Sequence, residues 1–227
     1  MQLTLSEAAR LLQAPERAVL RWVDERKLPA QRVGDQYRFN RAELLEWAIA
    51  NRVAVSPELA AAAEEAGAQA GVAEMLEAGG IFRGVAGSDR DAALRAVVRT
   101  LPLPEEVDPG FVFEMLRARE QLGSTALGDG VAIPHPRHPL VLNVANPSIT
   151  LCFLATPIDY GAPDGQPVAA LFTVLSPTVR AHLHALARLS FALLQPGFRG
   201  AVTRQAAAEE ILAEARAADA LARERGR

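Results

Sequence analysis

Hydrophobic and polar positions follow helical spacing in the N-terminal part of the chain. Thr4 and Glu7 form the pattern of a capping box ahead of an apolar run, which predicts a short helix that ends near Leu12. Pro15 suits the first turn of a second helix, which we expect to end near Lys27. Because only two residues separate the two helices, the pattern predicts a tight helix–turn–helix.

A spacing of two residues replaces the helical spacing over residues 31–39. Two short alternating segments flank Gly34-Asp35, a pair that favours a tight turn between antiparallel strands, so this stretch is expected to be a hairpin. Asn40 and Glu43 then repeat the capping-box pattern. They predict a further helix, whose apolar positions are Leu44, Leu45, Trp47 and Ile49.

The pattern changes twice more toward the C-terminus. Residues 51–79 are dominated by alanine, glutamate and glycine, and the strong helix formers in their centre predict a helical linker, which could also support a homodimer. Beyond them, helical spacing alternates with continuous apolar runs at 149–155 and 168–175, which are typical of buried strands. We therefore expect an α/β domain over residues 80–227.

Composition and charge narrow the functional classes. Half of the 227 residues are hydrophobic and only 5% are aromatic, so the core must be largely aliphatic. The net charge of −3 excludes a strongly basic or acidic partner for the chain as a whole, and residues 1–50 carry only +1. The lone Cys152 allows no internal disulfide, which suits a cytoplasmic protein. Polar residues interrupt the N-terminal apolar runs, so we expect neither a signal peptide nor a membrane span.

The N-terminal layout resembles the excisionase-like and MerR-like winged helix–turn–helix domains over about residues 2–50. Ala14-Pro15 and Ala18 depart from it, because that family often has a small polar cap and a threonine near the start of the second helix. The segments that carry the resemblance are Thr4 to Ala9, Val19 to Trp22, Leu28 to Ala30 and Arg32 to Phe39.

In a module of this kind, the second helix enters the major groove of DNA and the wing touches the DNA backbone. Arg17 and Arg21 are four residues apart and share one face of that helix, while Arg32 and Arg38 would lie on the wing. The resemblance thus implies DNA binding through these four arginines. The alternative is a helical module that docks a protein and leaves the arginines solvated.

The most informative stretch of the larger domain runs from Gly128 to His135. Two glycines, which permit tight turns, lead into a short apolar run and then into Pro134, which stiffens the chain. We expect His135 to lie at the edge of a strand rather than on a mobile loop. Imidazole is a good nucleophile that is mostly neutral near pH 7, so this histidine favours phosphoryl transfer.

The other histidines differ in their surroundings. His182 shares one side of its helix with leucines and is expected to face the body of the domain, whereas His184 shares a side with Arg188 and is expected to face solvent. His138 is close to His135 in sequence, but the neighbouring prolines argue against a helix that would present both on one face. A metal site is therefore not expected.

Several segments in the right order resemble enzyme IIA domains of the bacterial phosphotransferase system, in the fructose, mannitol and nitrogen-regulatory branch. Pro136 departs from this family, which commonly has glycine or another small residue after the active histidine. The resemblance implies a mixed β-sheet flanked by helices, with no cofactor and no metal ion. It covers about residues 80–217 and is carried by Arg119-Glu120, Gly123 to His135, Asp164 to Val168, and His182 to Ala187.

By this resemblance, His135 accepts a phosphoryl group through Nε2 from an HPr-like phosphocarrier protein and passes it to a IIB domain or holds it as a signal. His182 would help to hold the phosphate, and Arg119 would pair with its charge. Two hydroxyls and the glycine-rich backbone would supply further donors. These residues are Ser124, Thr125, Gly128 and Gly130.

The sequence thus divides into a winged helix–turn–helix domain over residues 1–50, a linker over 51–79, and an enzyme IIA-like domain over 80–227. Three functions remain open for this combination. The first is a phosphocarrier whose phosphorylation is coupled to DNA binding. The second is a sugar-transport enzyme IIA with a protein-docking N-terminal module, and the third is a transcription regulator that has lost phosphoryl transfer.

Overall fold

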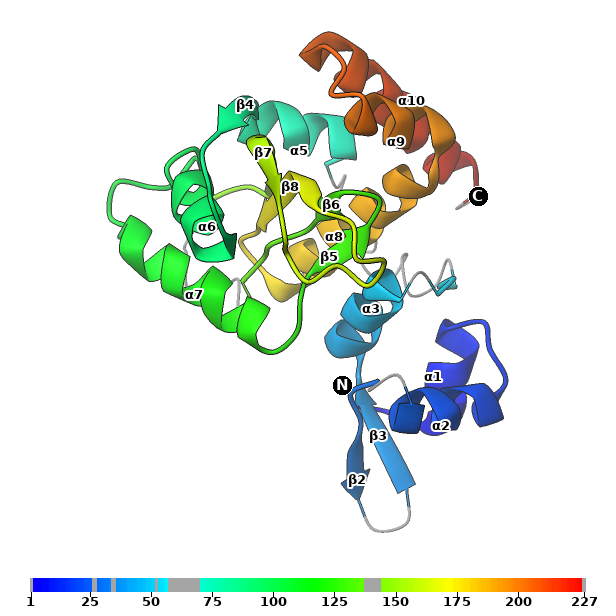
Figure 1. The fold of residues 1–227 in the computed structure, drawn as a ribbon. Helices are drawn as coiled ribbons and strands as arrows, with labels where there is room; N and C mark the ends of the chain where they lie inside the picture. Colours follow the sequence, from blue (N-terminus) through cyan, green and yellow to red (C-terminus); the bar gives the residue numbers. More distant parts are fainter. Residues whose placement is uncertain are drawn as a thin grey trace.

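The computed structural model describes residues 2–25, 28–33, 36–51, 53–56, 70–136 and 144–225. Within them the chain forms a small N-terminal domain, blue in Figure 1, and a larger α/β domain. The last helix of the small domain, α3 (Arg41–Ala50), lies between the two and packs against the larger domain (Figure 1).

The small domain has the predicted helix–turn–helix followed by a hairpin. The hairpin strands β2 and β3 are antiparallel, and a short N-terminal strand, β1, pairs with the other edge of β3. The elements are β1 (Gln2–Leu3), α1 (Leu5–Leu11), α2 (Glu16–Glu25), β2 (Gln31–Val33), β3 (Gln36–Asn40) and α3.

Hydrogen bonds between neighbouring residues cap the first helix of this domain. The Thr4 hydroxyl accepts a hydrogen bond from the backbone N of Glu7 at 3.3 Å, and the Glu7 carboxylate accepts one from the backbone N of Thr4 at 2.8 Å. The predicted capping box is therefore confirmed. Farther along, Trp22 of α2 and Trp47 of α3 pack with their ring centroids 5.3 Å apart, which joins the two helices.

The larger domain is built on a mixed sheet, whose strands within the described residues follow the order β4-β7-β8-β6-β5. β7 pairs with β8, and β6 with β5, in antiparallel fashion, whereas β4 with β7 and β6 with β8 are parallel. β7 and β8 contain the predicted apolar runs. The strands are β4 (Ile81–Val85), β5 (Ala126–Gly128), β6 (Val131–Ala132), β7 (Ser148–Ile158) and β8 (Val168–Leu175).

Helices cover both faces of this sheet, which confirms the α/β architecture with flanking helices. Successive residues of β7 alternate between two hydrophobic cores, so Leu151 and Phe153 face one core while Cys152 and Leu154 face the other. The first core is closed by α5 (Val72–Gly79), α8 (Val179–Leu194), α9 (Pro196–Thr203) and α10 (Ala208–Arg225), and the second by α6 (Arg90–Val98) and α7 (Pro109–Gln121).

Helix α5 corrects the predicted domain boundary. The sequence places residues 72–79 in the linker, yet Met75 and Leu76 are fully buried in the core beneath the sheet. The alanine-rich composition of the linker continues into this helix, so composition alone hides the boundary. The larger domain therefore begins before residue 80, and the central part of the predicted helical linker, residues 57–69, lies outside the described residues.

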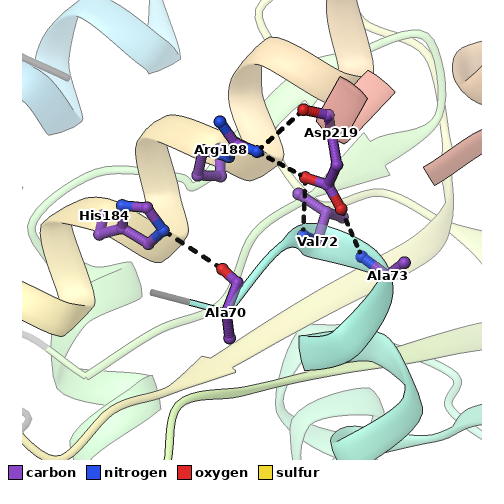
Figure 2. Close-up of polar contacts among 6 residues, drawn as sticks. All are labelled: Ala70, Val72, Ala73, His184, Arg188 and Asp219. Carbon is purple, nitrogen blue, oxygen red and sulfur yellow. Dashed lines mark hydrogen bonds and ion pairs between the residues drawn. The ribbon is translucent and has the colours of Figure 1, made fainter. Parts of the chain in front are cut away.

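A residue from the far end of the domain caps α5 (Figure 2). Gly71 occupies the N-cap position, and the Asp219 carboxylate of α10 accepts hydrogen bonds from the backbone N of Val72 at 3.0 Å and of Ala73 at 3.1 Å. The same carboxylate pairs with Arg188 of α8 at 3.0 Å. A Cβ at residue 71 would collide with this carboxylate, so a larger residue there would displace Asp219 from its capping position. The contact ties α5, α8 and α10 together.

Candidate functional site

Backbone pairing on two sides fixes the chain just ahead of His135. The backbone N of Ile133 donates to the carbonyl of Thr125 at 3.1 Å, and the carbonyl of Pro134 accepts from the backbone N of Val174 at 3.3 Å. These bonds extend the pairing of β6 beyond its last residue. His135 therefore lies at the edge of the sheet, as expected, and only 4% of it is exposed.

The ring of His135 has a defined tautomer. Its Nδ1 lies 2.7 Å from the carbonyl oxygen of Ile133. Because a carbonyl oxygen can only accept, Nδ1 carries the proton and donates it to this bond. A neutral imidazole then keeps its lone pair on Nε2. If the ring acts as a nucleophile, it can therefore do so only through Nε2.

His182 stands beside this ring. Helix α8 begins after Thr178, whose hydroxyl accepts a hydrogen bond from the backbone N of Ala181 at 3.0 Å, so His182 falls in the first turns of the helix. It is only 2% exposed, and its ring centroid is 5.2 Å from that of His135. The prediction that His182 faces the body of the domain is confirmed.

Arg119 brings a positive charge to the same place. It lies in the last turn of α7, and its Nη1 donates to the carbonyl of Gly123 at 3.1 Å. Arg119, Thr125 and His135 all line one cavity of about 20 Å³. The structure therefore brings these three predicted residues together, with His182 directly beside His135.

A buried carboxyl group, for which the sequence predicted no role, belongs to this cluster. Glu120 is 3% exposed and accepts hydrogen bonds from both the backbone N, at 3.0 Å, and the hydroxyl of Thr125. Burial raises the pKa of Glu120 above its usual range, although the bonds from Thr125 and the charge of Arg119 oppose the shift. One available signal is that Glu120 follows the buried Leu116 by about one helical turn.

The raised pKa of Glu120 predicts a pH-dependent stability. In the unfolded chain a glutamate ionises near its ordinary pKa, whereas in the folded protein Glu120 holds its proton to higher pH. Its stabilising contribution is thus complete below the ordinary pKa and is lost as pH rises through the folded pKa. We expect the free energy of unfolding to fall with pH more steeply in the wild type than in Glu120→Gln.

Urea unfolding at a series of pH values between about 4 and 7 measures this difference. Glu114→Gln, an exposed change on the same helix, is the matched control and should follow the wild type. Parallel pH profiles for the wild type and Glu120→Gln would contradict the shift.

The two hydroxyls predicted to bind phosphate are engaged within the protein. Ser124 donates to the carbonyl of Tyr160 at 2.7 Å, and Thr125 donates to Glu120. Each hydroxyl has a single proton, so each would have to leave its present acceptor before donating to a phosphate. Their phosphate-binding role stays a prediction.

Gly128 ends β5 and Gly130 lies in the turn before β6, and neither lines the cavity at His135. With Asp129 between them, they have φ values of +89°, +54° and +74°, a left-handed run that favours glycine. Gly130 lines a separate surface depression together with Asp164. The extended chain of β6 carries His135 away from this turn, so the structure does not bring these glycines together with the histidine.

His184 is buried, and the prediction that it faces solvent is wrong. It is 5% exposed, and its Nε2 lies 3.2 Å from the carbonyl oxygen of Ala70 (Figure 2). The segment that leads into α5 and helix α10 cover this side of α8, where Arg188 also meets Asp219. The remaining histidine, His138, lies outside the described residues.

The arginines of the small domain occupy the predicted elements. Arg17 and Arg21 are exposed on α2, and the Nε of Arg21 lies 3.8 Å from the carboxylate of Glu25. Arg32 lies on β2 and Arg38 on β3, the two strands of the hairpin. One helix and the wing beside it thus each carry two of the four predicted arginines.

Comparison with known families agrees with this architecture. Residues 74–215 match the family described as phosphoenolpyruvate-dependent sugar phosphotransferase system, EIIA 2. Residues 3–52 match a helix-turn-helix domain family. The chain therefore belongs to the type 2 EIIA family of the phosphotransferase system and carries an N-terminal helix-turn-helix domain.

Individual relatives place the chain near one branch of this family. A nitrogen regulatory protein of Pseudomonas aeruginosa is 37% identical over 117 residues, which cover 51% of this chain and 72% of that protein. One of Escherichia coli is 40% identical over 90 residues, or 39% of this chain and 52% of that protein. The crystal structure of nitrogen regulatory protein IIA-Ntr from Neisseria meningitidis has a TM-score of 0.55 at 32% identity and covers 63% of this chain and 98% of that one.

In the part of the chain that the structure describes, none of the helices combines the length and the hydropathy needed to cross a bilayer.

Proposed function

We propose that this protein is a regulatory phosphohistidine carrier in which Nε2 of His135 accepts a phosphoryl group from an HPr-like protein. The observation that carries the proposal is the hydrogen bond from Nδ1 of His135 to Ile133, because it leaves the lone pair on Nε2. The similarity to nitrogen regulatory proteins and the attached helix-turn-helix domain favour a regulatory role over sugar transport.

In the transfer, the lone pair of Nε2 forms a new P–N bond while the P–N bond of the donor's phosphohistidine breaks. The electron pair of the broken bond returns to the donor ring. Nδ1 of His135 keeps its proton throughout, so no net proton moves. Arg119 would offset the negative charge of the group in transit, and His182 would hold it from the adjacent helix.

Phosphoryl uptake by the whole chain tests this proposal. The protein is incubated with phosphoenolpyruvate, enzyme I and an HPr-like carrier, and its intact mass is then measured. We expect the mass to increase by one phosphoryl group. An unchanged mass would contradict the proposal and would favour a regulator that has lost phosphoryl transfer. A IIB domain added afterwards should leave the group in place if the protein is regulatory, and should remove it if the protein serves sugar transport.

We also propose that the small domain binds DNA. Its support is the helix-turn-helix match together with Arg17 and Arg21, which are both exposed on the second helix of the motif. In domains of this architecture the second helix lies in the major groove, where exposed arginines reach phosphates and base edges.

The Arg17→Ala and Arg21→Ala variants are expected to bind duplex DNA more weakly and with a shallower salt dependence. Each lost phosphate contact should reduce the slope of log affinity against log salt by about 0.9. Fluorescence anisotropy with a labelled duplex at several salt concentrations measures this slope. Arg216→Ala, an exposed arginine of α10, is the control and should retain the wild-type slope. Equal slopes for all four proteins would rule out phosphate contacts by α2.

A further inference from the structure

Helix α3 of the small domain reaches the histidine site of the larger one. Ile49 lines the cavity at His135 and packs against the hydrophobic cores of both domains. On the opposite side of the contact, Ala187 of α8 belongs to the core cluster of the small domain and Leu183 packs against that cluster. Figure 1 shows α3 lying next to α8 and β5. The small domain thus covers the larger domain where His135 lies.

The space beside His135 is small compared with a phosphoryl group. Its cavity measures about 20 Å³, and Ile49 and Leu186 supply apolar walls. A volume of this size holds about one water molecule. Nε2 of His135 is itself buried. A phosphoryl group adds a phosphorus and three oxygens at Nε2, which is more than this volume holds, so its acceptance favours the withdrawal of a wall.

The charge of a phosphoryl group, like its volume, disfavours the docked position of Ile49. A phosphoryl group adds about −1.5 to −2 charges near pH 7, by analogy with other phosphorylated side chains. The side chain of Ile49 can offer such a group neither a hydrogen bond nor a counter-charge, and enclosing a charge against an apolar wall is unfavourable. Of the cavity walls, the one formed by Ile49 comes from a separate domain, so it can withdraw without unfolding the sheet.

We propose that α3 docked on α8 and a phosphoryl group on His135 exclude one another. In the unphosphorylated protein the small domain closes the site, and phosphorylation keeps it released. This inference rests on the proposed role of His135 and assigns a regulation to that site. The HPr-like donor reaches Nε2 only after Ile49 withdraws, so the helix-turn-helix domain both restrains phosphorylation and senses it.

The Ile49→Gln variant tests the restraint. A polar side chain at this position weakens the docked form, and we expect faster phosphoryl uptake from the HPr-like donor. An open form populated at about 10% or less in the wild type predicts an acceleration of about tenfold or more. Ala54→Gln places the same side chain at an exposed position of the small domain and should retain the wild-type rate.

A second variant tests the same contact through a substitution in the larger domain. Ala187→Gln enlarges a buried residue of α8 that packs against the small domain, so it should accelerate uptake as well without altering the small domain. Because this variant leaves α3 unchanged, its result stands even if Ile49→Gln unfolds the small domain.

Amide hydrogen exchange of residues 43–49 tests the release. We expect faster exchange in the phosphorylated wild type than in the unphosphorylated protein, and no such change in His135→Ala treated with the same donor. Two results together would overturn the mutual exclusion while leaving the carrier function intact: unchanged exchange in a wild type that takes up the phosphoryl group, and uptake by Ile49→Gln and Ala187→Gln no faster than by the wild type. Absence of uptake in the wild type and in both variants would instead overturn the carrier function.

Discussion

The His135→Ala variant is expected to take up no phosphoryl group from phosphoenolpyruvate, enzyme I and an HPr-like carrier. The change removes the Nε2 lone pair that the bond to Ile133 fixes in place. His182→Ala should still be phosphorylated, but about a hundredfold more slowly, which is the typical cost of losing one group that stabilises a transition state. A time course of intact mass measures both effects.

His184, which lies on the same helix as His182, supplies the control for this experiment. His184→Gln keeps a side-chain N–H donor for the carbonyl of Ala70 and leaves the cavity at His135 untouched. It should therefore gain the phosphoryl group at the wild-type rate. Phosphoryl uptake by His135→Ala equal to that of the wild type would show that the acceptor lies elsewhere.

The largest effect on stability is expected for Asp219→Ala. This change leaves the guanidinium of Arg188 without the carboxylate beside it and removes the cap from α5. Removing one partner of a buried ion pair costs about 3–5 kcal/mol, and losing a helix cap typically costs about 1 kcal/mol. Urea unfolding followed by circular dichroism measures the loss.

An exposed ion pair on the same two helices is the natural comparison. Glu77 of α5 pairs with Arg216 of α10 at the surface, and such pairs contribute about 0–1 kcal/mol. We therefore expect Glu77→Ala to remain close to the wild type. If Asp219→Ala were destabilised no more than Glu77→Ala, the capping of α5 by α10 would not contribute to folding.

Patterns that act within a few residues predicted much of this fold. The capping box of Thr4 and Glu7, and the apolar runs that become β7 and β8, are fixed by neighbours along the chain, so they can be read from the sequence. The local pattern before His135 also pointed to this histidine. The type 2 EIIA resemblance added the roles of His182 and Arg119, whose positions beside His135 depend on the whole domain.

Contacts between distant segments could not be predicted in this way. The side of α8 that carries His184 looked polar, but the chain near Ala70 covers it, and no helical periodicity contains that information. The same is true of Asp219, which caps a helix 147 residues earlier in the chain. The contact of Glu120 with Thr125 was not predicted, because the turn after α7 rather than helical spacing places the two residues together.

Both ends of the segment between the two domains are fastened to folded structure. The backbone N of Ser56 donates to the carbonyl of Leu11 at 2.7 Å, and the carbonyl of Ala70 lies against His184 on α8. Only residues 57–69 separate these anchors. Because these residues join the two domains covalently, a detached small domain stays near its docking face on α8. Reclosure of the proposed open form is then a unimolecular event, whose rate does not depend on the concentration of the protein.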